Sequence, residues 1–253
     1  MTTMLEETVF SRTEALCDMR FHYCPGCAHG IVHRLVAETL VDLKVLDRTV
    51  GVCPVGCAVF AYDYFNCDMI QASHGRAPAV ATGVKRACPD AVVFTYQGDG
   101  DLASIGMAEI VHAAARGENI TVVFINNAVY GMTGGQMAPT TMIGQQTTTS
   151  PLGRDPGLAG YPIRVSELLA TLDGPTYITR QTIASPKEVL ATKRALTRAF
   201  QAQVDGKGFS LVEILSSCPT WWAKTPKDSL QWIESTMRGI YPPGVLVDRT
   251  GYA

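Results

Sequence analysis

Two short runs of apolar residues enclose an amphipathic segment in the middle of the chain. Residues 91–96 (AVVFTY) and 120–125 (ITVVFI) are rich in β-branched and aromatic side chains, which is typical of buried strands. Between them, residues 102–116 carry apolar side chains at helical spacing, with Glu109 and His112 on the wetter side. This pattern predicts a β-α-β unit with a crossover connection, so both strands end at the same edge of a parallel sheet.

The alternation of strands and helices continues on both sides of this unit. Periodic apolar positions predict helices at residues 31–43, 164–171, 186–204 and 229–238, another helix beginning near Pro78, and strands at 177–182 and 209–215. The length of 253 residues suits one sizeable α/β domain with a mainly parallel sheet flanked by helices. We expect this domain to span residues 1–253, with an irregular N-terminal arm over residues 1–21 and a C-terminal extension that docks on a partner.

Polar residues follow both strands of the central unit. Gly98-Asp99-Gly100-Asp101 comes after the first strand and Asn126-Asn127 after the second. Open α/β sheets bind ligands at the carboxyl edge of their strands, where Asp99 and Asn127 should meet. Mg²⁺ takes oxygen ligands and usually bridges one or two protein oxygens to phosphates. The glycines allow close approach to phosphate, and the N-terminus of the following helix favours negative charge. We therefore predict a magnesium diphosphate site here.

Two other interpretations of this segment compete with a cation site. Gly98, Gly100 and Ala103 fit the G-x-G-x-x-A fingerprint of dinucleotide-binding folds. However, Asp99 and Asp101 would repel a bare pyrophosphate, and asparagines stand where that fingerprint expects an acidic residue. A tight turn without a ligand is the remaining interpretation, and a lone Gly-Asp-Gly would not exclude it. The ordered combination of strand, helix, strand and Asn-Asn favours the cation.

Two further segments could contribute to such a site. His74-Gly75-Arg76 precedes the helix near Pro78, where it could contact a diphosphate or form a surface turn. Residues 132–162 are dominated by Gly, Thr, Gln and Pro and show little periodicity. A loop of this length inside a compact domain is usually functional or disordered. We expect it to cover substrate or coenzyme, with Thr133 and Gln136 as candidate contacts, although both side chains could also bond the loop itself.

Eight cysteines are many for a chain of this kind, which favours metal binding or redox chemistry over disulfides in the cytoplasm. Cys24-Pro-Gly-Cys27 can share a metal or a cluster. The apolar run that a thioredoxin-like dithiol needs before its first cysteine is missing. Either Cys53 or Cys57 could join this pair, and the residues alone do not choose. Cys218 follows the strand at 209–215 and is well placed as a fourth ligand.

The spacing of these cysteines also bears on the kind of metal. One local pair with two distant single cysteines is atypical of structural zinc sites, whereas a [4Fe–4S] cluster accepts ligands from far along the chain. The three other cysteines lack spaced partners and are interpreted as structural: Cys17, Cys67 and Cys88.

The string GDGD…NNAVYGMTGGQ, which begins at Gly98 and resumes at Asn126, resembles two known signatures. GDG followed by NN is similar to the thiamine diphosphate-binding motif. The fuller string resembles the β subunit of 2-oxoacid:ferredoxin oxidoreductases, over nearly the whole chain. By this resemblance the side chains of Asp99 and Asn127 and the carbonyl of Val129 would hold Mg²⁺. The other cofactor-binding positions that it implies are His74, Gly75, Arg76, Gly98, Gly100, Asp101, Tyr130, Gly131 and Thr133.

The same resemblance implies a [4Fe–4S] cluster. The family has its third cluster cysteine in a Gly-Cys pair, as in Gly56-Cys57, and its last one before a proline, as in Cys218. The implied ligands are therefore Cys24, Cys27, Cys57 and Cys218. Cys53 would then be a small buried apolar residue.

The implied activity is the oxidative decarboxylation of a 2-oxo acid, with thiamine diphosphate as cofactor, coenzyme A as acyl acceptor and ferredoxin as electron acceptor. The resemblance is closest to the 2-oxoglutarate and branched-chain 2-oxoacid types. It also implies an α-type subunit, which supplies the glutamate that activates the pyrimidine ring, and a small ferredoxin-like subunit.

Two competitors explain less of the sequence. A subunit of a non-oxidative thiamine enzyme, such as a 2-oxoacid decarboxylase or acetolactate synthase, leaves the cysteines without a role. A non-catalytic zinc-binding scaffold leaves Asp99 and Asn127 idle.

The charge and hydrophobicity of the chain indicate which kinds of partner to expect. A formal charge of −2 gives no reason to expect nucleic acid or an anionic membrane. No apolar run reaches the length of a membrane span, and the N-terminus lacks a signal-peptide pattern, so we expect a cytoplasmic protein. The 47% hydrophobic content fits a soluble chain with extensive buried surface, including subunit interfaces.

Overall fold

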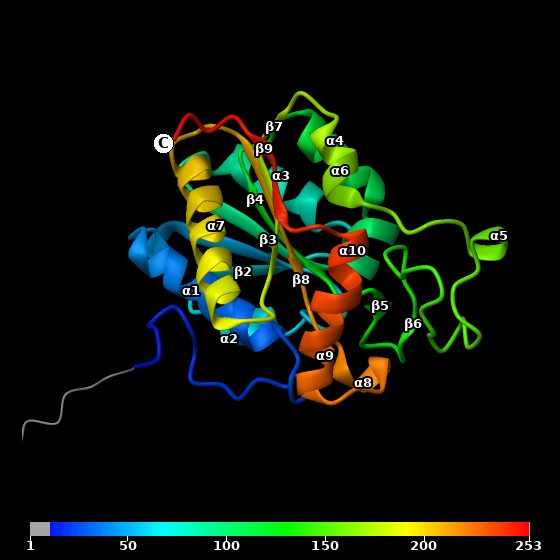
Figure 1. Cartoon of the computed structure of the whole chain (residues 1–253). Helices are drawn as coiled ribbons and strands as arrows, with labels where there is room; N and C mark the ends of the chain where they lie inside the picture. Colours follow the sequence, from blue (N-terminus) through cyan, green and yellow to red (C-terminus); the bar gives the residue numbers. More distant parts are fainter. Residues whose placement is uncertain (1–10, 253) are drawn as a thin grey trace, which may run out of the picture.

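Seven strands form one sheet in the order β2-β1-β3-β4-β8-β7-β9 (Figure 1). The computed structural model describes residues 11–252. All neighbouring strands are parallel except β7 and β9. The strands are β1 (Thr49–Cys53), β2 (Asp68–Gln71), β3 (Val92–Gly98), β4 (Thr121–Asn126), β7 (Pro175–Thr182), β8 (Phe209–Leu215) and β9 (Gly244–Asp248). The predicted mainly parallel sheet with flanking helices is confirmed.

Helices cover both faces of this sheet, as Figure 1 shows. One face packs against α1 (His29–Asp42), α7 (Pro186–Val204) and the segment from α9 (Pro226–Trp232) to α10 (Arg238–Ile240). The other face packs against α3 (Ala77–Ala87), α4 (Met107–Ala115) and α6 (Val165–Ala170). Along β4, Val123 and Ile125 belong to the first core and Val122 and Phe124 to the second. The strand is continuously apolar because both of its faces are buried.

Several predicted boundaries agree closely with the structure. The bounds of α7 and β8 are as predicted, since Ser185 caps α7 by accepting the Glu188 N–H and Pro186 begins it. The predicted continuous helix over residues 102–116 is wrong. A π-helical turn over Asp101–Ile105 ends at Gly106, and α4 begins only after it. A side chain at Gly106 would place its Cβ 2.6 Å from the Gly75 carbonyl oxygen, so this close approach requires glycine.

The C-terminal segment packs on the chain's own sheet, and its docking on a partner stays a prediction. β9 pairs antiparallel with β7, and Tyr241 is fully buried in the core. The strands β1, β2 and β9 were not predicted because they are short. In β1, Gly51 also interrupts the run of apolar residues that would indicate a strand. The remaining short elements are a 3₁₀ turn (Leu46–Arg48), α2 (Ala61–Tyr64), β5 (Val129–Tyr130), β6 (Gln136–Met137), α5 (Pro156–Ala159), α8 (Pro219–Trp222) and a π-helical turn (Ile233–Met237).

One buried arginine side chain, that of Arg154, holds together the long segment after β4. Arg154 is 5% exposed, and its guanidinium donates hydrogen bonds to six backbone carbonyls, those of Ala138, Pro139, Thr141, Ala159, Gly160 and Tyr161. Residues 132–162 therefore form a loop, as predicted, but its fixed shape comes from polar contacts that leave no periodic signal in the sequence.

The N-terminal arm falls only partly within the described residues. Residues 1–10 lie outside them, and residues 11–28 form no helix and only one strand-like bridge, between Leu16 and Phe65. From residue 11 to residue 252, none of the helices combines the length and the apolar character needed to cross a lipid bilayer.

Candidate active site

A pocket lies where β3 and β4 end. The register pairs Gly98 with Ile125, so the residues that follow each strand emerge side by side. Asp99 and Asn127 are 2% and 6% exposed, and both line this pocket. The meeting of these two side chains, expected from the parallel crossover, is observed.

Asp99 is a buried carboxylate whose protein donors are all neutral. Its Oδ1 accepts the Gly100 N–H at 2.8 Å and its Oδ2 accepts the Thr140 hydroxyl at 2.6 Å. Burial raises the pKa of Asp99 to about 6, because desolvation outweighs these hydrogen bonds. A divalent cation would compensate such a charge. The nearby oxygens suit Mg²⁺, since the amide Oδ1 of Asn127 lies in the same pocket and accepts only the Val129 N–H, at 3.2 Å.

The lining of the pocket includes most of the predicted cofactor positions. The lining residues after β4 are Val129, Tyr130, Gly131 and Thr133, and those from the other segments are Gly98, Gly100, Asp101 and His74. Gly100 is required here, because a Cβ would lie 2.2 Å from the ring of Tyr130. Thr133 bonds Gln136 through its hydroxyl, at 2.7 Å, so these two side chains do satisfy the loop itself.

Asp101 is saturated by protein donors and holds His74. Its Oδ1 accepts from His74 Nδ1 at 2.6 Å and from the Gly75 N–H at 2.9 Å, and its Oδ2 accepts from Gln97 Nε2 at 2.6 Å. With Nδ1 engaged, Nε2 is the ring nitrogen of His74 that can meet a ligand. Gly75 and Arg76 do not line the pocket, and Arg76 forms an ion pair with Glu109 instead. The structure therefore brings only His74 of this tripeptide to the site.

His29 lines the same pocket and was not predicted to belong to it. Its Nδ1 lies 3.0 Å from the Tyr96 hydroxyl, and the ring of Tyr23 stacks on it with centroids 4.7 Å apart. The only sequence signal was its position two residues after Cys27, at the beginning of a helix. One turn later, His33 is fully buried and packs parallel to the ring of Phe65 at 4.8 Å.

Lowering the pH from 7 to 5 is expected to destabilise the wild-type fold more than that of His33→Phe. Burial lowers the pKa of His33 to about 3, so the ring stays neutral in the folded protein. The unfolded chain takes up the proton near pH 6.5. The contribution of neutral His33 to the free energy of unfolding is therefore complete above about pH 6.5, and about 2 kcal/mol of it is lost at pH 5. Unfolding in urea at both pH values checks this, because every other titrating group is shared. Equal losses in the two proteins would contradict it.

The four predicted cluster cysteines surround a second cavity, of about 220 Å³. Cys24, Cys27, Cys57 and Cys218 all line it, whereas Cys53 is fully buried in the core. Burial raises the pKa of Cys57 and of Cys218 to about 12, and a bound metal would favour their thiolate forms. Between residues 11 and 252 no three His, Cys, Asp or Glu side chains converge closely enough for a single ion. Four cysteines around one cavity are a donor set that a [4Fe–4S] cluster can take.

The two cavities share a wall. Cys57, Asn127, Gly131 and Met132 line both of them. A Cβ on Gly131 would lie 3.0 Å from Cys57 Sγ and 3.8 Å from Asn127 Nδ2, so glycine allows a predicted cluster cysteine to lie close to a predicted magnesium ligand.

Two tryptophans form hydrogen bonds with the residues of this shared wall. The indole N–H of Trp221 donates to the Gly131 carbonyl at 2.6 Å, and that of Trp222 donates to the Asn127 carbonyl at 3.1 Å. The helix that follows Cys218 thus holds the segment that follows β4.

Comparison with known proteins agrees with this geometry. Residues 54–214 match the thiamine pyrophosphate enzyme family, C-terminal TPP-binding domain. The chain is 50% identical over 242 residues to ketoisovalerate oxidoreductase subunit VorA of Methanothermobacter thermautotrophicus, covering 96% of this chain and 51% of that protein. It therefore spans about half the length of this relative.

Two further similarities complete the comparison. Over 218 residues the chain is 34% identical to 2-oxoglutarate synthase subunit KorB of Methanocaldococcus jannaschii, covering 84% of this chain and 76% of that protein. A solved structure of 2-oxoglutarate:ferredoxin oxidoreductase from Magnetococcus marinus shares the fold, with a TM-score of 0.75 at 24% identity over 95% of this chain and 85% of that one. The chain belongs to the thiamine pyrophosphate enzyme family, among the subunits of 2-oxoacid oxidoreductases.

Proposed function

We propose that this chain is the thiamine diphosphate- and cluster-binding subunit of a 2-oxoacid:ferredoxin oxidoreductase. In the overall reaction a 2-oxo acid, coenzyme A and two oxidised ferredoxins give an acyl-CoA, CO₂, a proton and two reduced ferredoxins. The observation that carries the proposal is the shared wall of the two cavities. Family membership implies thiamine diphosphate, Mg²⁺ and a [4Fe–4S] cluster, and the residues that line the two adjoining cavities support a site for each of them.

The residues of the chain have distinct roles in this proposal. Asp99, Asn127 and the Val129 carbonyl would hold Mg²⁺, and His74, held by Asp101, would meet the diphosphate. Bound thiamine diphosphate supplies the electron sink that decarboxylation needs. The four cysteines would hold the cluster in the adjoining cavity, which Trp221 also lines. A non-oxidative thiamine enzyme would have no use for this second cavity.

The substrate and the acyl acceptor are proposed from the relatives. One similar protein is named for ketoisovalerate and another for 2-oxoglutarate, and the solved structure contains 2-oxoglutarate, coenzyme A and succinyl-CoA. We propose a branched-chain or dicarboxylic 2-oxo acid as substrate and coenzyme A as co-substrate. A cytoplasmic location stays a prediction.

The test is anaerobic, CoA-dependent reduction of viologen by the purified enzyme, with a panel of 2-oxo acids. We expect turnover with one or more of them and a brown absorbance that dithionite bleaches. Colourless protein that still decarboxylates 2-oxo acids would overturn the proposal in favour of a non-oxidative enzyme.

The chain alone is expected to be inactive, because no glutamate between residues 11 and 252 lines the diphosphate pocket. Several of these glutamates are engaged by arginines: Glu109 by Arg76, Glu118 by Arg86 and Arg116, Glu167 and Glu213 by Arg180, and Glu188 and Glu234 by Arg238. We propose that an α-type subunit supplies the glutamate that activates the pyrimidine ring, and that a small ferredoxin-like subunit completes the assembly. The relatives are themselves named as subunits.

This partner requirement can be measured directly. The chain is purified with its iron intact, loaded with Mg²⁺ and thiamine diphosphate, and assayed for release of CO₂ from 2-oxo acids. We expect no release until the α-type subunit is added. Turnover by the chain alone, at the rate of the full complex, would show that the activating acid lies in this sequence.

A further inference from the structure

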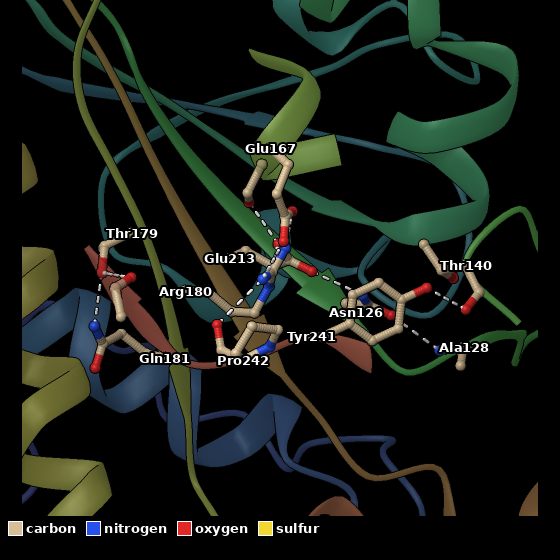
Figure 2. A network of polar contacts seen from close by, with 12 residues as sticks. Asn126, Ala128, Thr140, Glu167, Thr179, Arg180, Gln181, Glu213, Tyr241 and Pro242 are labelled. Carbon is tan, nitrogen blue, oxygen red and sulfur yellow. Dashed lines mark hydrogen bonds and ion pairs between the residues drawn. The ribbon is translucent and has the colours of Figure 1, made fainter. Parts of the chain in front are cut away.

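A buried ionic network joins residues of β4, β7, β8 and α6 (Figure 2). Arg180 on β7 is fully buried, and its Nε donates to Glu213 Oε2 on β8 at 2.8 Å. Its Nη1 donates to Glu167 Oε1 on α6 at 2.9 Å. Glu213 is only 1% exposed. A buried carboxylate of this kind needs its cationic partner, and the pair is costly to break.

Glu213 also contacts the first asparagine of the Asn-Asn pair. Its Oε1 accepts from Asn126 Nδ2 at 2.8 Å, and Asn126 Oδ1 in turn accepts the Ala128 N–H at 3.2 Å. Asn126 is fully buried and does not line the pocket. Its amide is therefore used as a link between Glu213 and the turn that follows β4, and not as a ligand.

This turn has a conformation that an alanine does not adopt readily. Ala128 has a φ of +58°, in the left-handed region. Its N–H is held by Asn126, and its carbonyl accepts from the Thr141 hydroxyl at 2.6 Å and from Gln145 Nε2 at 3.2 Å. Asn127 and Val129, the two predicted magnesium ligands after β4, flank this alanine, so their placement depends on the left-handed turn.

The network also connects to Asp99, through Tyr241 and Thr140. The Arg180 guanidinium lies over the Tyr241 ring, 5.4 Å from its centroid. The Tyr241 hydroxyl donates to the Thr140 carbonyl at 2.5 Å, and the Thr140 hydroxyl donates to Asp99 Oδ2 at 2.6 Å. Figure 2 shows Tyr241 between Arg180 and Thr140.

We propose that Glu213 is a positioning residue for the magnesium site: through Asn126 it holds the left-handed turn at Ala128, which sets Asn127 and the Val129 carbonyl. Arg180 fixes the Glu213 carboxylate in place. This inference rests on the proposed function, because it assigns a role toward the cation that binds the diphosphate. Partners of this kind behind metal ligands commonly change metal affinity by about 10- to 100-fold when they are removed.

The test measures binding and not turnover. Assembled enzyme freed of Mg²⁺ and thiamine diphosphate is titrated calorimetrically with thiamine diphosphate at fixed Mg²⁺, and then with Mn²⁺ followed by its electron paramagnetic resonance. For Glu213→Gln we expect about a tenfold or greater loss of affinity for both, at full iron content. Asn126→Ala should show the same loss while leaving the Arg180 ion pairs intact, and it carries the test if Glu213→Gln does not fold.

The control is Glu167→Gln, which removes the other carboxylate bound to Arg180 from the more exposed side of the network. For Glu167→Gln we expect a lower unfolding temperature and nearly unchanged affinity for thiamine diphosphate and Mn²⁺. Adding Ala128→Gly to Glu213→Gln should restore part of the affinity, because glycine adopts the left-handed conformation freely. The inference is overturned if wild type binds and folded Glu213→Gln or Asn126→Ala binds equally well, or if Glu167→Gln weakens binding as much. Failure of wild type to bind thiamine diphosphate would instead overturn the proposed function.

Discussion

Replacing Asp99 with asparagine is expected to weaken Mg²⁺-dependent binding of thiamine diphosphate by about a hundredfold or more, without loss of iron. The carboxylate is 2% exposed, and its protein donors are all neutral: the Thr140 hydroxyl and backbone N–H groups that include that of Gly100. A cation bound to it would be left beside a neutral amide and a diphosphate. Losing one partner of a buried charge pair costs about 2–5 kcal/mol, and about 2.8 kcal/mol corresponds to a hundredfold change.

Calorimetric titration of the anaerobic protein with thiamine diphosphate, at saturating Mg²⁺, measures this change. Asp90→Asn is the matched control, because Asp90 is exposed and lies before the opposite end of β3. It makes the same chemical change and should leave affinity unaltered. Iron content reports separately on the cysteine cavity. Equal affinities for Asp99→Asn and wild type would exclude the carboxylate as the principal protein ligand of the cation.

The parts of the fold that were predicted correctly are those specified by local signals. The capped helix α7 and the buried strand β8 have the predicted bounds, because a capping serine, a proline and an uninterrupted apolar run mark them. The break at Gly106 and the pairing of β9 with β7 depend on contacts between distant segments, Gly75 in one case and a strand 60 or more residues earlier in the other. No window of the sequence contains both partners.

The same distinction applies to the site. Asp99 and Asn127 could be paired from sequence because the parallel crossover dictates that neighbouring strands end together. The choice of Cys57 over Cys53 came from family resemblance, and the cavity now places Cys57 with Cys24, Cys27 and Cys218. His29, which lines the pocket, Thr140, which bonds Asp99, and Glu213, which bonds Asn126 behind it, were missed, since the packing of their segments is set by the whole fold. Arg76 was included by motif, but its ion pair with Glu109 holds it elsewhere.

Replacing Cys57 with serine is expected to remove the cluster, whereas replacing Cys53 with serine is expected to leave it in place. Cys57 lines the cavity with the other three cysteines. A serine hydroxyl is a poor ligand for iron, because clusters are held by thiolates. Cys53 ends β1 within the core, fully buried, so its serine variant should lose about 1–3 kcal/mol of stability through an unsatisfied hydroxyl and still bind iron.

Iron and acid-labile sulfide per chain, with the visible spectrum before and after dithionite, decide between the two cysteines. Each variant controls for the other, since the chemical change is identical and the positions are four residues apart. Thermal unfolding separates loss of fold from loss of cluster. Iron retained in Cys57→Ser and lost in Cys53→Ser would reassign the ligand. The assignment matters because, of the four predicted cluster ligands, Cys57 is the one that also lines the pocket of Asp99 and Asn127. Loss of iron in Cys57→Ser would therefore place a cluster ligand in the wall that the two cavities share.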